Sequence, residues 1–335
     1  MPDPGWTPNF SLPLGQNGHI RTSDPIGATM TSTHVGLTPG ATIGWIGTGI
    51  MGAPMAGHAV KAGFTVRAWA RRPEAAEVLT KYGVDVVDEA SAVAEGADAI
   101  VTIVSMPSDV RTVVLGEGGL LDSAKSGSVL VDMTTSEPSL AIEIAKRAAE
   151  RGVGSVDAPV SGGQAGAENG KLSVMVGGSD DDVAVVMPLL ESFAAKIIHQ
   201  GAPGAGQHTK MANQISVAGS MIGLCESLMY AAGAGLDLEK VVQTVSAGAG
   251  GSAAYTAMGP KVVAGDMSPG FRVEHFLKDL GIVLAESKAM KIALPGTAVA
   301  EQLYRATMAL GHDRDGTQAL IQALAHLNNR DWPSA

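Results

Sequence analysis

Short apolar runs alternate with helix-like patterns through the first part of the chain. Apolar stretches typical of β-strands occupy residues 42–47, 64–70, 97–105, 127–133, 152–160, 172–178 and 195–201. Between several of them, apolar positions three and four apart, closed by a glycine, predict helices over 53–63, 73–83 and 138–152. Strand, helix and strand in series are typical of a parallel sheet joined by right-handed crossovers.

The strand pattern stops near residue 201. From there to about residue 329 the sequence reads as helices, separated by breaks such as GAGLD, GAGGS and LPG. We therefore predict an α/β domain over 41–202 and an all-helical domain over 203–330. Residues 1–40 are rich in Pro, Gly, Ser and Thr and have no period of 2 or 3.6, so a disordered extension is predicted there.

The most apolar stretch, residues 215–234, has two interpretations. Its composition fits a membrane span, but it carries Glu226 and many small residues, so a buried helix is favoured and no membrane association is predicted. A net charge of −10 over 335 residues argues against nucleic acid as the main partner. The single cysteine, Cys225, excludes a disulfide framework, and no signal peptide is visible, so a cytoplasmic location is expected.

A glycine-rich turn follows the first predicted strand. The stretch GWIGTGIMG places Gly47, Gly49 and Gly52 in the spacing G-x-G-x-x-G between a strand and a helix. The first glycine permits a tight turn, the second allows backbone to approach a pyrophosphate, and the third lets helix and strand pack closely. Ile50 and Met51 open the helix, whose free N–H groups attract phosphate. The pattern predicts dinucleotide binding by a Rossmann-type doubly wound parallel sheet; the alternative is a turn without a ligand.

Two arginines stand where many dinucleotide sites place an acid. At the end of the second strand an Asp or Glu would accept from the ribose 2′-OH of NAD and repel a 2′-phosphate. This chain has Arg71 and Arg72 there, and guanidinium groups pair with phosphate oxygens. The sequence therefore predicts NADP, with NAD still possible; the alternative is two solvated arginines.

A polar loop follows the strand that ends near residue 160. Ser161, Gly162 and Gly163 offer a hydroxyl and backbone N–H groups suited to a small carboxylate. An ordinary turn is the competing interpretation.

Two further polar stretches interrupt apolar helical patterns. Lys210 and Asn213 are three residues apart and share a helix face, which is typical of side chains that line a cleft. Lys278 and Asp279 either form a surface ion pair or belong to a site, and this stretch alone leaves both open. No metal site is predicted.

Taken in order and spacing, these stretches resemble the β-hydroxyacid dehydrogenase family, which includes 3-hydroxyisobutyrate dehydrogenase and tartronate semialdehyde (2-hydroxy-3-oxopropionate) reductase. The resemblance covers about residues 42–329 and rests on GWIGTGIMG, VDMTTSEP, DAPVSGGQAGAENGKLSVMVGG, GAGQHTKMANQ and PGFRVEHFLKDL. It implies an NAD(P)-dependent oxidoreductase that interconverts a small β-hydroxyacid and its semialdehyde. It also implies a homodimer or homotetramer paired through the helical domain.

The resemblance implies residue roles as well. Lys210 matches the family's catalytic lysine, and Asn213 matches the asparagine that binds substrate and orients that lysine. The loop 161–163 matches the substrate-carboxylate loop. Lys278 matches a lysine at the junction of cofactor and substrate, and Thr135 matches a contact to the nicotinamide half of the cofactor.

The chain departs from the family pattern at two cofactor positions. The usual Leu-Pro after the fourth strand is replaced by Val104-Ser105, so the cofactor contact expected at Val104 departs from the pattern. The Asn-Arg-Thr/Ser of NADP users is replaced by Ala70-Arg71-Arg72, which removes one polar contact and adds a charge.

Other functions remain open at this stage. A related imine reductase is disfavoured because its lysine position usually holds Asp or Tyr, whereas this chain has Lys210. A non-enzymatic dinucleotide sensor would be expected to lose that lysine. A glyoxylate or succinic semialdehyde reductase would use the same chemistry. The favoured substrates are tartronate semialdehyde and methylmalonate semialdehyde, with the former slightly ahead.

Overall fold

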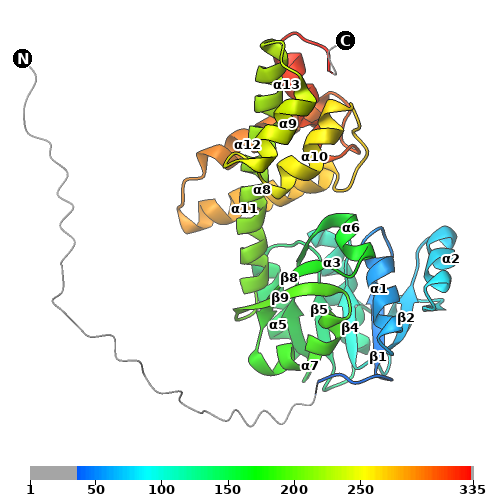
Figure 1. The fold of residues 1–335 in the computed structure, drawn as a ribbon. Coiled ribbons are helices and arrows are strands. Elements are labelled where there is room, and N and C mark those ends of the chain that lie inside the picture. Colours follow the sequence, from blue (N-terminus) through cyan, green and yellow to red (C-terminus); the bar gives the residue numbers. More distant parts are fainter. Residues whose placement is uncertain (1–35, 333–335) are drawn as a thin grey trace, which may run out of the picture. The chain divides into compact units, whose positions relative to one another are not determined.

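The computed structural model of the protein describes residues 36–332, in which an α/β part is followed by a helical part (Figure 1). The nine strands form one sheet in the order β3-β2-β1-β4-β5-β6-β8-β7, with β9 paired to β8. Their bounds are β1 Thr42–Ile46, β2 Thr65–Trp69, β3 Asp85–Val87, β4 Ala99–Thr102, β5 Val129–Asp132, β6 Gly154–Asp157, β7 Val160–Ser161, β8 Leu172–Gly178 and β9 Ala194–Gly201.

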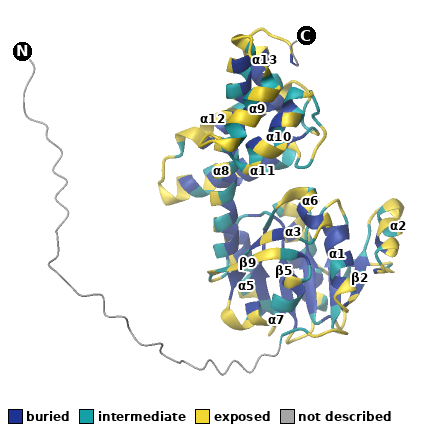
Figure 2. Cartoon of the chain, in the orientation of Figure 1, coloured by how far each residue is buried: buried dark blue, intermediate teal, exposed yellow. Residues whose placement is uncertain are grey.

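The first six strands form the predicted parallel sheet. Every neighbouring pair from β3 to β6 is parallel, in the strand order 3-2-1-4-5-6 of a doubly wound dinucleotide-binding fold. Side chains alternate between its two faces: Val129 and Val131 join one apolar core, whereas Leu130 joins another. Both faces are therefore buried, as is usual for parallel sheets (Figure 2).

Helices connect these strands. Their bounds are α1 Gly52–Lys61, α2 Pro73–Lys81, α3 Pro107–Leu115, α4 Leu120–Ser123, α5 Pro138–Ala149, α6 Gly163–Glu168 and α7 Asp180–Glu191, with a 3₁₀ turn at Ser91–Val93.

From α8 onward the described chain is helical. The bounds are α8 Ala205–Gly233, α9 Leu238–Ala247, α10 Ala253–Val263, α11 Val273–Met290, α12 Pro295–Ala309 and α13 Leu320–Leu327, with a 3₁₀ turn at Thr317–Ala319. This part has its own core, in which the rings of Phe276 and Tyr304 pack edge to face with their centroids 4.9 Å apart. The predicted α/β fold with a helical second half is confirmed.

The structure differs from the sequence prediction at the far edge of the sheet. The strand β8 runs antiparallel to β6 and β7, and β9 is parallel to β8. Between β7 and β8 lies only the six-residue helix α6, and the chain reverses there at Gly162 and Gly163, whose φ angles are +129° and +59°. The sequence pattern reports strands but not their direction, so this reversal was missed. The short strand β3 was also missed.

The predicted extension lies mostly outside the described residues, but its end, residues 36–40, belongs to the fold. The amide of Leu37 donates to the carbonyl of Val185 at 2.8 Å, and that of Gly40 donates to Gly63 at 2.8 Å. Backbone hydrogen bonds order this segment, and they need no apolar periodicity, so the prediction of disorder is wrong for these residues.

The helix α8 contains the apolar stretch that had two interpretations. By length and composition it is the one described helix able to cross a membrane, although the core helix of a soluble protein passes the same test. Its buried residues, such as Ala218, Met221 and Leu228, recur three to four positions apart and face the helical core. Only 33% of its most apolar window is buried, so one face is buried and the other remains uncovered.

Candidate active site

The glycine-rich turn lies between the end of β1 and α1. Gly47 has φ +106°, and a Cβ there would collide with the carbonyl oxygen of Ile103 just beyond β4. A Cβ on Gly52 would collide with the carbonyl oxygen of Gly47, so the helix packs directly onto the turn. Gly49, in contrast, faces open space. A turn that is packed at its ends and open at its middle glycine fits the approach of a pyrophosphate to the backbone.

The loops beside this turn lie at the carboxyl ends of adjacent strands. Because β1 pairs with β2 on one side and β4 on the other, the strand order reverses here, which is where doubly wound sheets bind dinucleotides. The amide of Val104, after β4, donates to the Thr134 hydroxyl, after β5, at 2.9 Å. Val104 thus links the two loops through its backbone amide, a contact that does not depend on its side chain.

Arg71 and Arg72 lie directly after β2. Both side chains are exposed, and no residue among 36–332 forms an ion pair with either. Their guanidinium groups are therefore available to an external anion beside the glycine-rich turn.

A buried carboxyl group fixes the loop that carries Thr135. Asp132 accepts from the Thr102 hydroxyl at 2.8 Å and from the Thr134 amide at 3.1 Å. Burial raises the pKa of Asp132 to about 6, although the hydrogen bonds from Thr102 and Thr134 oppose the rise. The side chain therefore ties β4 to the loop after β5 from within the core.

A second buried carboxylate anchors the helix that carries Lys210. Asp157, at the end of β6, accepts from the amides of Gly204 and Gln207 at 2.7 and 2.9 Å. Burial raises the pKa of Asp157, and these backbone hydrogen bonds oppose the rise. The start of α8 is thereby attached to the sheet, one turn before Lys210.

Lys210 is buried next to the predicted carboxylate loop. Its Nζ donates to the carbonyl of Val160 at 2.8 Å, and Val160 directly precedes Ser161. Desolvation by burial lowers the pKa of Lys210 to about 8; the charge of Asp279 opposes this shift and that of Lys278 adds to it. This shift brings the pKa of the lysine closer to the range in which general acids and bases work.

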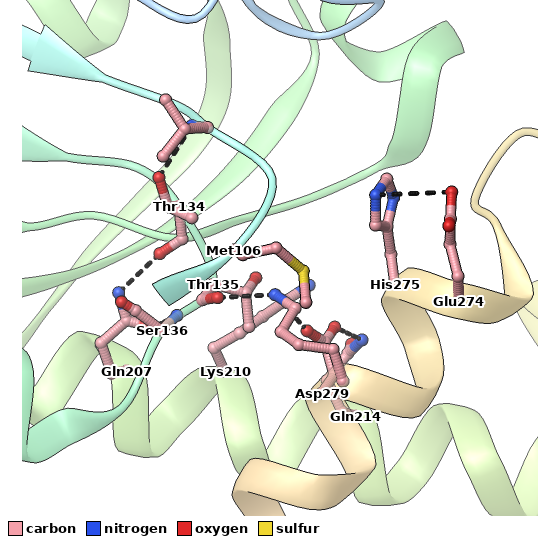
Figure 3. Close-up of polar contacts among 12 residues, drawn as sticks. Met106, Thr134, Thr135, Ser136, Gln207, Lys210, Gln214, Glu274, His275 and Asp279 are labelled. Atoms are coloured by element: carbon pink, nitrogen blue, oxygen red, sulfur yellow. Dashed lines mark hydrogen bonds and ion pairs between the residues drawn. The ribbon is translucent and has the colours of Figure 1, made fainter. Parts of the chain in front are cut away.

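Lys278 contacts two residues of the site, Thr135 and Asp279, which lie near each other and near Lys210 (Figure 3). Its Nζ donates to the carbonyl of Thr135 at 2.6 Å and lies 2.7 Å from Oδ1 of Asp279. The side chains of Lys278 and Asp279 are 11% and 1% exposed, so the pair is buried and not the surface pair that the sequence left open. The lysine and the threonine that were assigned to the cofactor junction are thus in contact.

Two glutamines of α8 belong to the same network and were missed in the sequence. Gln207 donates to the carbonyl of Thr134 at 2.7 Å and accepts from the amide of Ser136 at 3.0 Å. Gln214 donates to Asp279 at 2.5 Å and accepts from Asn213 at 2.8 Å. The available signal was spacing: Gln207 and Gln214 lie three residues before and four after Lys210, so all three share one face.

The predicted carboxylate loop is open to solvent and close to the helical part. Gly162 and Gly163 are exposed, and a Cβ on Gly163 would lie 4.0 Å from the carbonyl oxygen of Gly270, just before α11. An open cleft of about 370 Å³ is bordered by Met106 and Lys278 but by no residue of this loop. The larger hollow, of about 500 Å³, lies elsewhere, around Tyr230 and Arg330, and contains none of the predicted site residues.

Comparisons with known proteins agree with this geometry. Residues 42–201 match the family described as the NAD binding domain of 6-phosphogluconate dehydrogenase, and residues 204–324 match the family described as NAD-binding of NADP-dependent 3-hydroxyisobutyrate dehydrogenase. The chain is 50% identical to the probable 3-hydroxyisobutyrate dehydrogenase-like 1, mitochondrial, of Arabidopsis thaliana, over 88% of each chain. It is 36% identical to 2-hydroxy-3-oxopropionate reductase of Escherichia coli K12, over 86% of this chain and 98% of that protein.

A solved structure is similar throughout. The 3-hydroxyisobutyrate dehydrogenase of Mycobacterium tuberculosis, determined with L-serine, has a TM-score of 0.76 and 31% identity, and covers 85% of this chain and 99% of its own. The protein described here belongs to the β-hydroxyacid dehydrogenase family, an oxidoreductase family whose members use a nicotinamide dinucleotide.

Proposed function

We propose that this protein is an NADP(H)-dependent enzyme that interconverts a small β-hydroxyacid and its semialdehyde, with Lys210 as the general acid and base. The favoured substrate is tartronate semialdehyde, slightly ahead of methylmalonate semialdehyde. The observation that carries the proposal is the position of the Lys210 ammonium, buried and 2.8 Å from the carbonyl that precedes the loop 161–163. The proposed proton donor is thus adjacent to the loop proposed to bind the carboxylate.

The chemistry divides between cofactor and protein. When bound, the nicotinamide supplies hydride to the aldehyde carbon or takes it from the alcohol carbon. In reduction, the Lys210 ammonium donates its proton to the carbonyl oxygen, which becomes the hydroxyl. In oxidation, the neutral amine takes the hydroxyl proton back. Ser161 and the amides of Gly162 and Gly163 hold the carboxylate, and Asn213 orients the reacting group.

The cofactor proposal rests on the glycine-rich turn and the arginines. The open backbone at Gly49 would receive the pyrophosphate, and Thr135 and Lys278 would border the nicotinamide. The guanidinium groups of Arg71 and Arg72, which form no ion pair with residues 36–332, favour a 2′-phosphate and hence NADP over NAD.

The pKa of Lys210 predicts opposite pH profiles for the two directions. Reduction needs the ammonium form, so its kcat/KM should fall as pH rises through about 8. Oxidation needs the free amine, so its kcat/KM should rise over the same range. Initial rates with saturating cofactor from pH 6 to 10 measure both. Two profiles that are flat, or that move in the same direction, would rule out Lys210 as the group that exchanges the proton.

A substrate panel tests the proposed function directly. With NADPH, we expect kcat/KM to be highest for tartronate or methylmalonate semialdehyde and low for propanal, long-chain aldehydes and cyclic imines. Removing the carboxylate leaves the groups of the loop unpaired, which costs about 1–3 kcal/mol per group. Two relatives support this size class. The Escherichia coli relative is named 2-hydroxy-3-oxopropionate reductase, and the Mycobacterium tuberculosis structure was determined with L-serine; both compounds have three carbons. An imine or neutral aldehyde that outperforms both semialdehydes would overturn the proposal.

The uncovered face of α8 supports a homo-oligomer. Along this face lie small residues and Tyr230, which is 78% exposed, beside the hollow that also includes Glu226 and Arg330. A helix this apolar is stabilised when its second face is also covered. Because Glu226 is charged, a second copy of this protein is favoured over lipid as the partner of that face. We expect sedimentation to show a dimer or tetramer, and Tyr230→Asp to shift it toward monomer. A wild-type monomer at micromolar concentration contradicts the proposal.

The cytoplasm remains the proposed location. Cys225 is buried and has no disulfide partner, which suits a reducing compartment.

A further inference from the structure

Gln214 donates one hydrogen bond and accepts another in the buried part of the site. Its Nε2 donates to Oδ2 of Asp279 at 2.5 Å, and its Oε1 accepts from Nδ2 of Asn213 at 2.8 Å. Gln214 and Asp279 are 2% and 1% exposed, so water does not substitute for either contact. The three side chains form one continuous chain from α11 to the turn of α8 that carries Lys210.

The Asp279 carboxylate fixes the direction of this chain. Its other oxygen, Oδ1, lies 2.7 Å from the Lys278 ammonium and forms an ion pair with it, although not in hydrogen-bond geometry. An ionised carboxylate only accepts hydrogen bonds, so the Gln214 amide must present its N–H group to it. The Gln214 oxygen then points to Asn213 and requires the Asn213 N–H group. An amide that is otherwise free to flip is thereby held in one orientation.

This orientation has a consequence for Asn213. One of its two amide N–H groups donates to Gln214, and no hydrogen bond to its carbonyl oxygen is formed by any residue in the described range 36–332. Asn213 is half-buried and lies one turn after Lys210 on the same face. Its free oxygen is an acceptor suited to an ammonium or a hydroxyl, and unsuited to a carboxylate.

We propose that Gln214, oriented by Asp279, is a positioning residue that holds Asn213 with its carbonyl oxygen toward the reacting centre. There the oxygen accepts from the substrate hydroxyl or from the Lys210 ammonium. If the Asn213 amide were reversed, its N–H group would face the ammonium and repel it. The proposal rests on the proposed function, because it assigns a residue to the same reaction.

A double-mutant cycle tests the proposal. Asn213→Ala and Gln214→Leu should each lower kcat/KM for the semialdehyde by about 10–100-fold, the effect of losing one hydrogen bond to a charged group. Because Gln214 acts through Asn213, the double variant should be about as active as Asn213→Ala alone. The Kd for NADPH should stay within about twofold throughout. Gln322→Leu, which removes another single hydrogen bond of the helical part, is the matched control and should keep wild-type rates.

The outcomes are distinguishable. Additive losses in the cycle, or an equal weakening of NADPH binding, would overturn the positioning role and indicate a general structural one. If Gln214→Leu does not fold, Asp279→Asn replaces it in the cycle, because an amide at 279 no longer dictates the chain's direction; additive losses again overturn the proposal. A wild-type enzyme that reduces neither semialdehyde refutes the proposed function, whereas an active wild type with an additive cycle refutes only this inference.

Discussion

Replacing Lys210 with alanine lowers kcat by about two to four orders of magnitude, the usual contribution of a positioned general acid or base. The expectation follows from the contact of its Nζ with Val160 beside the loop 161–163 and from the lowered pKa of Lys210. Lys278 is not expected to take over, because its Nζ is held by Thr135 and Asp279.

The fold should tolerate this substitution. Burial lowers the pKa of Lys210 to about 8, so burying its ammonium opposes folding, fully below about pH 8 and less as pH rises toward the ordinary value of 10.5. Removing this charge at neutral pH therefore relieves a cost. Lys210→Met, which keeps most of the volume, separates the loss of charge from the cavity left by alanine. The Tm of the methionine variant should therefore not fall at pH 7.

Steady-state kinetics and direct NADPH titration complete the test. The Kd for NADPH should remain near wild type in both variants, because the glycine-rich turn and the arginines lie on other elements. The exposed Lys196 of β9, changed to alanine, is the matched control and should keep full activity. A loss of less than tenfold in both Lys210 variants would show that another group moves the proton.

Much of the fold follows from local sequence signals. The alternation at Val129–Val131 and the glycine spacing 47–49–52 are set by backbone geometry within one or two elements, so they are visible without tertiary information. The direction of β8 is different, because it depends on a reversal at Gly162–Gly163 and on pairing with β6, which is distant in sequence. Local periodicity contains no information on that pairing.

The site shows the same division. Lys210, Asn213 and the loop 161–163 stand out because polar residues interrupt apolar patterns or follow a strand. Asp279 and Gln214 meet across 65 residues of sequence, and only the packing of α8 against α11 brings them together. Burial also decides how a charged pair is interpreted. From the sequence alone, the neighbours Lys278 and Asp279 fit a surface ion pair as well as a buried pair within a site.

The second large effect is expected at the cofactor site. Changing both Arg71 and Arg72 to alanine should weaken NADPH far more than NADH. Each charge-assisted contact to a phosphate contributes about 1.5–3 kcal/mol, so each arginine that reaches the 2′-phosphate accounts for about tenfold or more in Kd. Both guanidinium groups are exposed and form no ion pair with residues 36–332, so no internal contact is lost and Tm should not change.

The discriminating quantity is the ratio of the two dissociation constants, measured by titration of wild type and variant. NADH has a 2′-hydroxyl, so its Kd should change little, and the ratio of NADH to NADPH affinity should rise by about the full loss in NADPH binding. Arg147→Ala, an exposed arginine at the end of α5, controls for the general loss of positive charge. A 2′-phosphate contact acts on NADPH alone, and the Arg147 variant reports how far a general loss of positive charge weakens the more anionic NADPH. Equal weakening of NADPH and NADH in the Arg71 and Arg72 variant, or a wild type that prefers NADH, would refute the assignment of NADP.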